Sequence, residues 1–88
     1  TYAIGNDASI MFSAYNSTLS MQPRASIGMK VSSDLGGELV FNTRNNSGYA
    51  ERMRIKETGI INFANVPTSS AGLSSGDIYK IGGALMIV

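Results

Sequence analysis

Apolar and polar residues alternate with a period of two along most of this chain. Successive side chains of a β-strand point to opposite faces, so this alternation predicts strands with one apolar face each. The clearest example is Met53 and Ile55, which lie between Arg52, Arg54 and Lys56. The other alternating runs cover residues 10–15, 27–32, 38–43 and 60–64. No window keeps the i, i+3, i+4, i+7 spacing of a helix, and we therefore predict an all-β chain.

Turn-forming sequences separate the alternating runs. Residues 34–37 (DLGG), 45–48 (NNSG) and 57–59 (ETG) contain the Gly and Asn residues that tolerate a positive φ. Strands that recur about every twelve residues with turns between them are typical of a meander or a winding β-structure.

The last quarter of the chain differs from the rest in its amino-acid composition. Residues 64–76 are rich in Pro, Ser and Gly, which predicts an extended crossover. Gly82-Gly83 between two apolar runs then predicts a two-residue hairpin turn, with Ile78 opposite Ile87 and both hairpin faces largely apolar. We therefore divide the chain into a β-strand module (1–63), a crossover (64–76) and a hairpin cap (77–88).

Composition indicates that a single copy has few means of stabilising itself. At 88 residues, a folded monomer would bury only about 60–65% of its unfolded surface. Cys and His are both absent, so disulfides and thiolate or imidazole metal ligands are excluded. Oligomerisation is the remaining common source of stability. Because the sequence begins at Thr1, we expect it to be part of a longer or processed protein.

Charge and hydropathy exclude several partners. The net charge of +1, with 15% charged residues, is too small for a nucleic-acid surface. No run approaches the roughly 20 apolar residues of a membrane span, and no signal peptide is recognisable. We expect neither nucleic-acid binding nor membrane insertion.

The acidic residues give little reason to expect catalysis. They are scattered along the chain, mostly at turns and strand ends, where Asp and Glu are common for structural reasons. They are Asp7, Asp34, Glu38, Glu51, Glu57 and Asp77. An active site needs several groups in complementary roles. We predict a protein without catalytic, cofactor-binding or metal-binding residues.

Two sets of residues are weak candidates for contact with a glycan. Arg52, Arg54 and Lys56 are expected on one side of a strand, where they could bind an anionic sugar. Such charges more often form a solvated face or pair with acids of adjacent strands, such as Glu38, Glu51 and Glu57. Among the tyrosines, Tyr15 is expected to be the most exposed and could stack on a sugar ring, although strand tyrosines are mostly structural.

Two segments resemble parts of phage structural proteins. GELVFNT (37–43), a polar loop, ERMRI (51–55) and TGII (58–61) together resemble a module in the distal shafts of phage tail fibres and related virion appendages. Residues 72–88 (GLSSGDIYKIGGALMIV) resemble a recurrent carboxyl-terminal ending of phage structural proteins. The resemblance implies a homotrimer, as a β-prism or triple β-helix, that acts in adsorption to the host. Such shafts are often followed by a chaperone domain that carries a Ser-Asp self-cleavage motif, and we recognise no such domain within these 88 residues.

The thin apolar faces of the strands fit such an assembly. Each strand offers only two or three apolar residues to one side, and three copies around an axis would convert these faces into a filled core. The residues predicted to form the trimer core are Ile27, Met29, Val31, Leu39, Phe41, Met53, Ile55, Ile61, Phe63, Ile78, Leu85 and Ile87.

The predicted function is that of a virion structural protein without enzymatic activity. The chain would form the carboxyl-terminal part of a trimeric phage tail fibre, or of a fibre-like appendage, involved in host attachment. Its expected partners are copies of itself, other tail or capsid proteins, and a host-surface glycan or protein. The alternative is a capsid or tail decoration protein that stabilises the particle without binding a receptor. A glycan-cleaving enzyme is disfavoured because the carboxylates are scattered.

Overall fold

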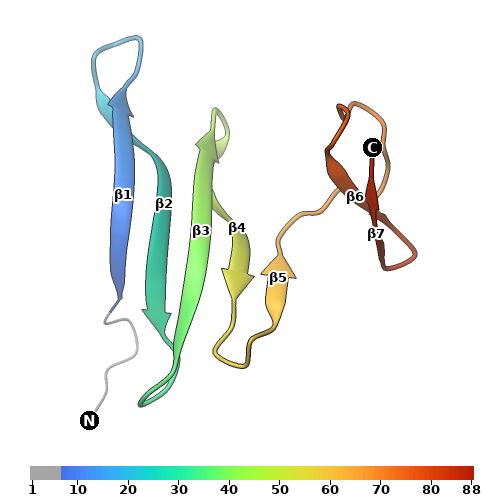
Figure 1. Ribbon diagram of the computed structural model, residues 1–88. Helices are drawn as coiled ribbons and strands as arrows, with labels where there is room; N and C mark the ends of the chain where they lie inside the picture. Colours follow the sequence, from blue (N-terminus) through green and yellow to red (C-terminus); the bar gives the residue numbers. More distant parts are fainter. Residues whose placement is uncertain (1–6) are drawn as a thin grey trace.

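The strands form two separate antiparallel sheets in a computed structural model, which describes residues 7–88 (Figure 1). The five-stranded sheet contains β1 (Ala8–Tyr15), β2 (Met21–Val31), β3 (Gly37–Asn45), β4 (Gly48–Ile55) and β5 (Ile61–Phe63). A two-stranded sheet follows, made of β6 (Ile78–Ile81) and β7 (Ala84–Ile87). The described residues form no helix, which confirms the predicted all-β class. They accordingly include no helix that could cross a membrane.

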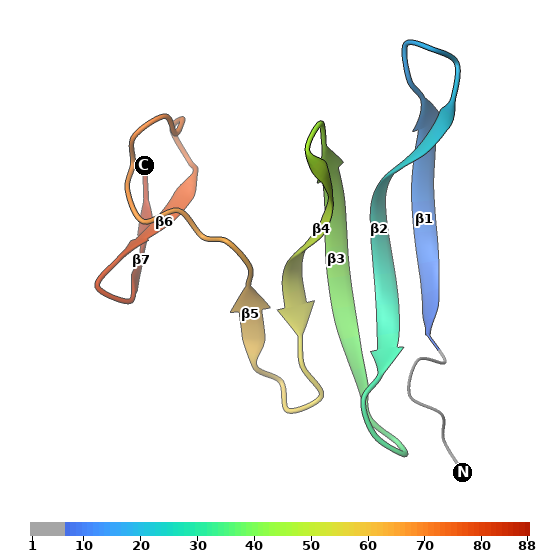
Figure 2. The same ribbon diagram turned by 180° about the vertical axis from the view of Figure 1, so that it is seen from behind.

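The five-stranded sheet is a meander in which each strand pairs with the next one along the chain (Figures 1 and 2). Its order, β1-β2-β3-β4-β5, leaves β1 and β5 as the two edges. The pairing register shifts at two places, between Phe12 and Ser13 on β1 and between Phe41 and Asn42 on β3. Each shift is a β-bulge or a similar irregularity, which locally breaks the alternation of side chains.

One face of this sheet, which we call the apolar face, carries two rows of cross-strand neighbours. The first row contains Ile10, Ile27, Phe41, Met53 and Phe63, and the second contains Ala8, Met29, Leu39, Ile55 and Ile61. Directly opposed residues on paired strands share a face, so each row runs across all five strands. The opposite face, which we call the polar face, carries residues such as Ser26, Glu38, Asn42 and Arg54.

Very little of the described chain is buried. Val40, at 2% exposure, is the one fully buried hydrophobic side chain among residues 7–88, and Ser26 is buried at 5%. Both belong to the polar face. On the apolar face, by contrast, Ile61 is 54% exposed and Phe63 is 45% exposed. The side on which a single copy should have its core is therefore the side that remains uncovered.

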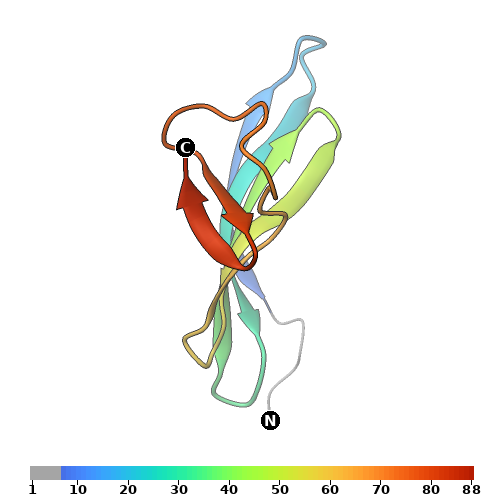
Figure 3. The ribbon, with the colours of Figure 1, turned by 90° about the vertical axis from the view of Figure 1, so that its right-hand side faces the viewer.

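The molecule is a thin slab rather than a compact domain. Its extents are 48 × 41 × 17 Å, and Figure 3 shows the five-stranded sheet from its side, with the hairpin in front of it. The radius of gyration is 16.0 Å, against about 12 Å for a compact domain of this length. The accessible surface is 6406 Å², whereas a compact monomer of 9.3 kDa would expose about 5,000 Å². The excess is about 1,400 Å².

The carboxyl-terminal hairpin has the register that the sequence predicts. Ile78 pairs with Ile87, Tyr79 with Met86, Lys80 with Leu85 and Ile81 with Ala84. Gly82 (φ 56°) and Gly83 (φ 85°) both adopt a positive φ, as a type I′ turn requires. In the described part of the chain, no strand of the five-stranded sheet contacts β6 or β7.

The segment between the two sheets differs from the extended crossover that its composition suggests. It contains a series of turns, closed by hydrogen bonds from Leu73 N to Ser70 O and from Asp77 N to Ser74 O. It also pairs with the hairpin, since Lys80 N donates to Pro67 O at 2.8 Å. The prediction of an extended path is wrong because local and hairpin hydrogen bonds satisfy the backbone groups of this segment.

Candidate interaction surface

Nine of the predicted core residues lie together on the apolar face. Alternation and register bring them there from β2, β3, β4 and β5, although they are spread over 37 residues of sequence. They are Ile27, Met29, Val31, Leu39, Phe41, Met53, Ile55, Ile61 and Phe63. Their proximity agrees with a shared role, and the role itself stays a prediction. The sequence-based set omitted Ile10, which extends the first row onto β1 and is 65% exposed.

The three remaining core candidates share one face of the hairpin. Ile78 opposes Ile87, and Leu85 opposes Lys80, so these four side chains point to one side of β6 and β7. Ile78 is 47% exposed and Ile87 is 72% exposed. The structure thus presents a second uncovered apolar surface, which does not contact the first.

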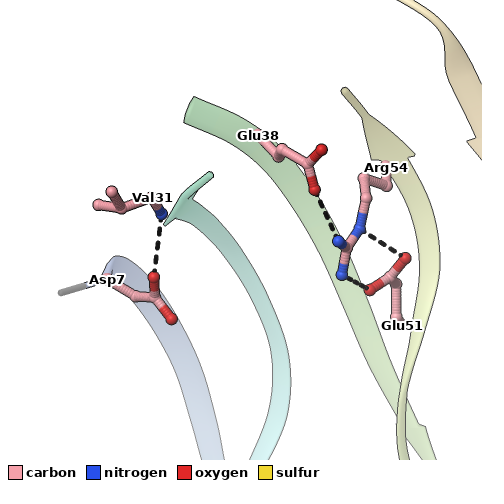
Figure 4. Close-up of polar contacts among 5 residues, drawn as sticks. All are labelled: Asp7, Val31, Glu38, Glu51 and Arg54. Carbon is pink, nitrogen blue, oxygen red and sulfur yellow. Dashed lines mark hydrogen bonds and ion pairs between the residues drawn. The ribbon is translucent and has the colours of Figure 1, made fainter. Parts of the chain in front are cut away.

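On the polar face, the Arg54 guanidinium joins two carboxylates from adjacent strands (Figure 4). Its Nη1 donates to Glu38 Oε1 at 2.7 Å, and its Nε and Nη2 donate to the two Glu51 oxygens at 3.0 and 2.5 Å. The bonds to Glu51 raise the pKa of Arg54, against the opposing effect of partial burial and with a further contribution from Glu38. Strand pairing thus brings Glu38 and Glu51 together, although they are far apart in sequence. Both pair with Arg54, so the three side chains form an ion-paired structural cluster.

The predicted ridge of Arg52, Arg54 and Lys56 is wrong for its first two members. Asn42 pairs with Glu51 and Phe41 with Met53, which leaves Arg52 as the extra residue of a bulge. The Arg52 Nε donates at 2.8 Å to the Thr43 hydroxyl, and Thr43 alternates onto the same side of β3 as Phe41. Arg54 instead binds acids on the polar face, so the two arginine head groups have partners on opposite faces. Lys56 follows the end of β4 and is exposed.

A small hydrogen-bonded cluster on the polar face was not predicted from the sequence. The Ser26 hydroxyl accepts hydrogen bonds from the Tyr49 hydroxyl and from Asn42 Nδ2, the latter at 3.0 Å. Ser26 lies on β2, Asn42 on β3 and Tyr49 on β4, so only the strand pairing brings them together. Nothing in the local sequence marks them, apart from the presence of a small polar residue within an apolar run.

The remaining candidate, Tyr15, is remote from this cluster. It ends β1 and is 63% exposed, and its backbone carbonyl accepts a hydrogen bond from Arg24 at 3.0 Å. Tyr2 lies outside the described residues. Among residues 7–88, no group of three acids comes close enough together to hold a metal ion.

Comparison with known proteins adds no relative. No protein-family model, curated protein or solved structure matches the chain. Function is therefore inferred from the exposed apolar face, the hydrogen-bonded polar face and the hairpin.

Proposed function

We propose that this chain is a non-enzymatic structural module that assembles with two further copies of itself as a trimeric fibre. The observation that carries the proposal is the uncovered apolar face, whose two rows cross all five strands of the sheet. Large exposed apolar patches on a soluble protein are typical of interaction sites. Apart from Arg52, which bonds Thr43 on this side, the face carries apolar residues, and an apolar partner surface fits it.

The missing buried area supports copies of the same chain as the partner. The excess of about 1,400 Å² in accessible surface is close to what two interfaces of about 800 Å² per partner would cover. A protomer in a closed ring of three contacts two neighbours, and each neighbour offers the same apolar face. At roughly 25 cal/mol per Å² of apolar area, such burial would supply the stability that one copy lacks.

The width of the sheet also suits three copies around an axis. Five strands spaced about 4.8 Å apart give a side of about 24 Å, which places each sheet of a triangular prism about 7 Å from its axis. Side chains on packed sheets span about 5 Å each, so large residues are needed in the middle strand to reach the centre. The central strand β3 provides Phe41 there, between Ile27 and Met53.

The sequence resemblance to phage tail-fibre shafts supports a proposal for where this assembly is found. We propose a virion location, within a tail fibre or a fibre-like appendage that contributes to host attachment. The alternative is a capsid or tail decoration protein that does not bind the host. Competition for adsorption would separate them: the purified protein should block adsorption of the parent particle if it belongs to an attachment fibre, and should have no effect if it is a decoration protein.

The assembly itself is tested by light scattering on residues 1–88. We expect a mass three times the 9.3 kDa of one copy. A stable monomer would contradict self-association. A dimer would mean that two apolar faces pack directly as a sandwich and would contradict the three-fold arrangement.

A further inference from the structure

The two edges of the five-stranded sheet differ in how they are protected (Figure 1). An edge strand carries unpaired N–H and C=O groups, which can pair with another chain. The edge at β5 is only three residues long, and very short edge strands are a common protection. The edge at β1, which we call the β1 edge, covers the eight residues Ala8–Tyr15 and contains no charged residue, proline or glycine. It therefore offers a long ladder without the usual protection.

Strand β1 keeps its regular alternation of side chains over its whole length. The register shift near Phe12 adds its extra residue, Arg24, to β2 and not to β1. All eight residues of β1 are exposed, with Ile10 on the apolar face and Met11 on the polar face. A strand added to the β1 edge would therefore gain backbone hydrogen bonds and side-chain contacts on both faces.

The sequence of β1 is close to a palindrome. Residues 8–14 read ASIMFSA, and Met11 is the centre of this stretch. Antiparallel pairing of two copies about Met11 opposes identical or similar residues throughout. The pairs are Ala8 with Ala14, Ser9 with Ser13, Ile10 with Phe12, and Met11 with itself. Hydroxyls thus oppose hydroxyls and large apolar side chains oppose each other, and such cross-strand pairs stabilise antiparallel sheets.

The backbone groups of β1 fit the same register. In an antiparallel sheet, the N–H and C=O groups of alternate residues point to opposite sides of a strand, so one alternate set of β1 bonds β2 and the other points outward. Because Met11 opposes itself, odd-numbered residues always oppose odd-numbered ones. The outward-pointing groups of one copy therefore meet the outward-pointing groups of the other, and the apolar faces of the two sheets lie on the same side.

We propose that the β1 edge binds the β1 edge of a second copy, in antiparallel register centred on Met11. The near-palindrome of residues 8–14 is the reason for choosing this partner, since a neighbour's β5 fits the edge less well. β5 has only three residues, and around a three-fold axis it would pair with β1 in parallel, because both strands point the same way in this meander. Parallel pairing is slightly less stable per residue.

This contact goes beyond the proposed trimer, because it uses an edge of the sheet whereas the trimer uses the apolar face. It links two trimers side by side. A contact along one strand is much smaller than a standard interface of about 800 Å² per partner, so we expect a Kd of about 1 mM. At micromolar concentrations the trimers should therefore stay separate.

Disulfide trapping at a chain concentration of about 1 mM tests the register, because the chain has no cysteine of its own. Opposed Cα atoms of an antiparallel pair lie about 4.5 or 5.5 Å apart, and both distances allow a disulfide. Met11→Cys brings two thiols together. As their S–S bond forms, oxidised glutathione takes up the two hydrogen atoms and is reduced to two thiols. We expect a two-chain product on a non-reducing gel, at about tenfold the yield given by Ser9→Cys.

Ser9→Cys is the matched control, since it is exposed and lies on the same face of the same strand. Ser9 opposes Ser13 in the proposed register, so the thiols of two Ser9→Cys chains would be offset by about 13 Å along the strands, too far for a disulfide. Chains with Ser9→Cys and chains with Ser13→Cys should each stay single, and should cross-link to each other when mixed. All three positions are exposed, so no buried contact is lost.

The inference is overturned if Met11→Cys gives no more product than Ser9→Cys, or if the mixed pair does not form. Light scattering at micromolar concentrations separates this result from the fate of the proposed trimer. Trimers without the Met11→Cys product would overturn the edge contact alone. The same product from a protein that is otherwise monomeric would support the edge contact and overturn the proposed trimer.

Discussion

Phe41 on β3 lies directly across from Met53 on β4, and immediately beyond this pair the two strands shift register. The shift places Glu51 opposite Asn42 and leaves Arg52 as the extra residue. Met53 therefore stays in the apolar row, while Glu51 reaches Arg54 on the polar face. This one register shift thus determines which charged side chains of the ERMRI segment lie on the polar face.

A charge in the apolar row should prevent self-association. Met53→Lys places an ammonium group beside Phe41 and Phe63, where the proposed contact between copies would remove it from water at a cost of several kcal/mol. We expect light scattering to give a monomer or an aggregate in place of a trimer, and Ile55→Asp to behave in the same way. Asn62→Lys, on the opposite face of β5, is the matched control and should form normal trimers. Normal trimers from Met53→Lys would show that the faces have been assigned the wrong way round.

Removing the Arg54 guanidinium should weaken the sheet while leaving the assembly intact. Arg54→Ala deletes three hydrogen bonds in a partly exposed cluster, and we expect a loss of about 1 kcal/mol in urea unfolding. The pKa of Arg54 is raised in the folded state, so this group stabilises fully below its ordinary pKa and loses that contribution only at strongly alkaline pH. The difference between wild type and variant should therefore not fall between about pH 7 and pH 9. Arg52→Ala, which removes one hydrogen bond to Thr43, should cost less, and equal costs would argue against a special role for the cluster.

Ser26→Ala should be costly for so small a change. Ser26 is only 5% exposed, and its hydroxyl is the common acceptor of the Tyr49 hydroxyl and the Asn42 amide. The substitution leaves both donors without this acceptor. Each hydrogen bond lost between such partly buried groups costs about 1 kcal/mol. Thermal unfolding followed by circular dichroism should show a clear drop in Tm, whereas Ser9→Ala, at an exposed position of β1, should have little effect. Equal Tm values for the two variants would mean that water replaces the serine.

The hairpin should depend on the conformation of its turn. Gly83 has a φ of 85°, which a β-branched residue adopts only with strain of about 1–2 kcal/mol or more. We expect Gly83→Val to abolish the cross-strand nuclear Overhauser effects between Tyr79 and Met86. Gly82→Asn should preserve them, since Asn tolerates the left-handed region at a φ of 56°. Intact hairpin signals in Gly83→Val would show that packing, rather than the turn, fixes this register.

The features that the sequence predicted correctly are those encoded by neighbouring residues. The register of β6 and β7 follows from Gly82-Gly83 alone, because a two-residue turn leaves only one pairing in phase. The apolar face follows from the alternation of residues such as Met53 and Ile55.

The features that the sequence did not predict depend on a partner strand. The bulge at Arg52 exists only relative to β3, and the bond between Ser26 and Tyr49 joins residues 23 positions apart. The prediction of an extended path for residues 64–76 was wrong, because composition does not indicate which donor a backbone group such as Pro67 O will bond.

Among residues 7–88, Val40 is the one buried hydrophobic residue, and this has a consequence for how the protein folds. Under the proposed assembly, most of the hydrophobic core forms between chains, so each chain acts as a ligand that binds the folded state of the others. Its apparent melting temperature would then rise with protein concentration, and dilution alone would act as a denaturant. Folding and assembly would then be a single reaction that is third order in chain concentration. An intact fibre would protect the folded state, because it holds the three chains at a high effective concentration.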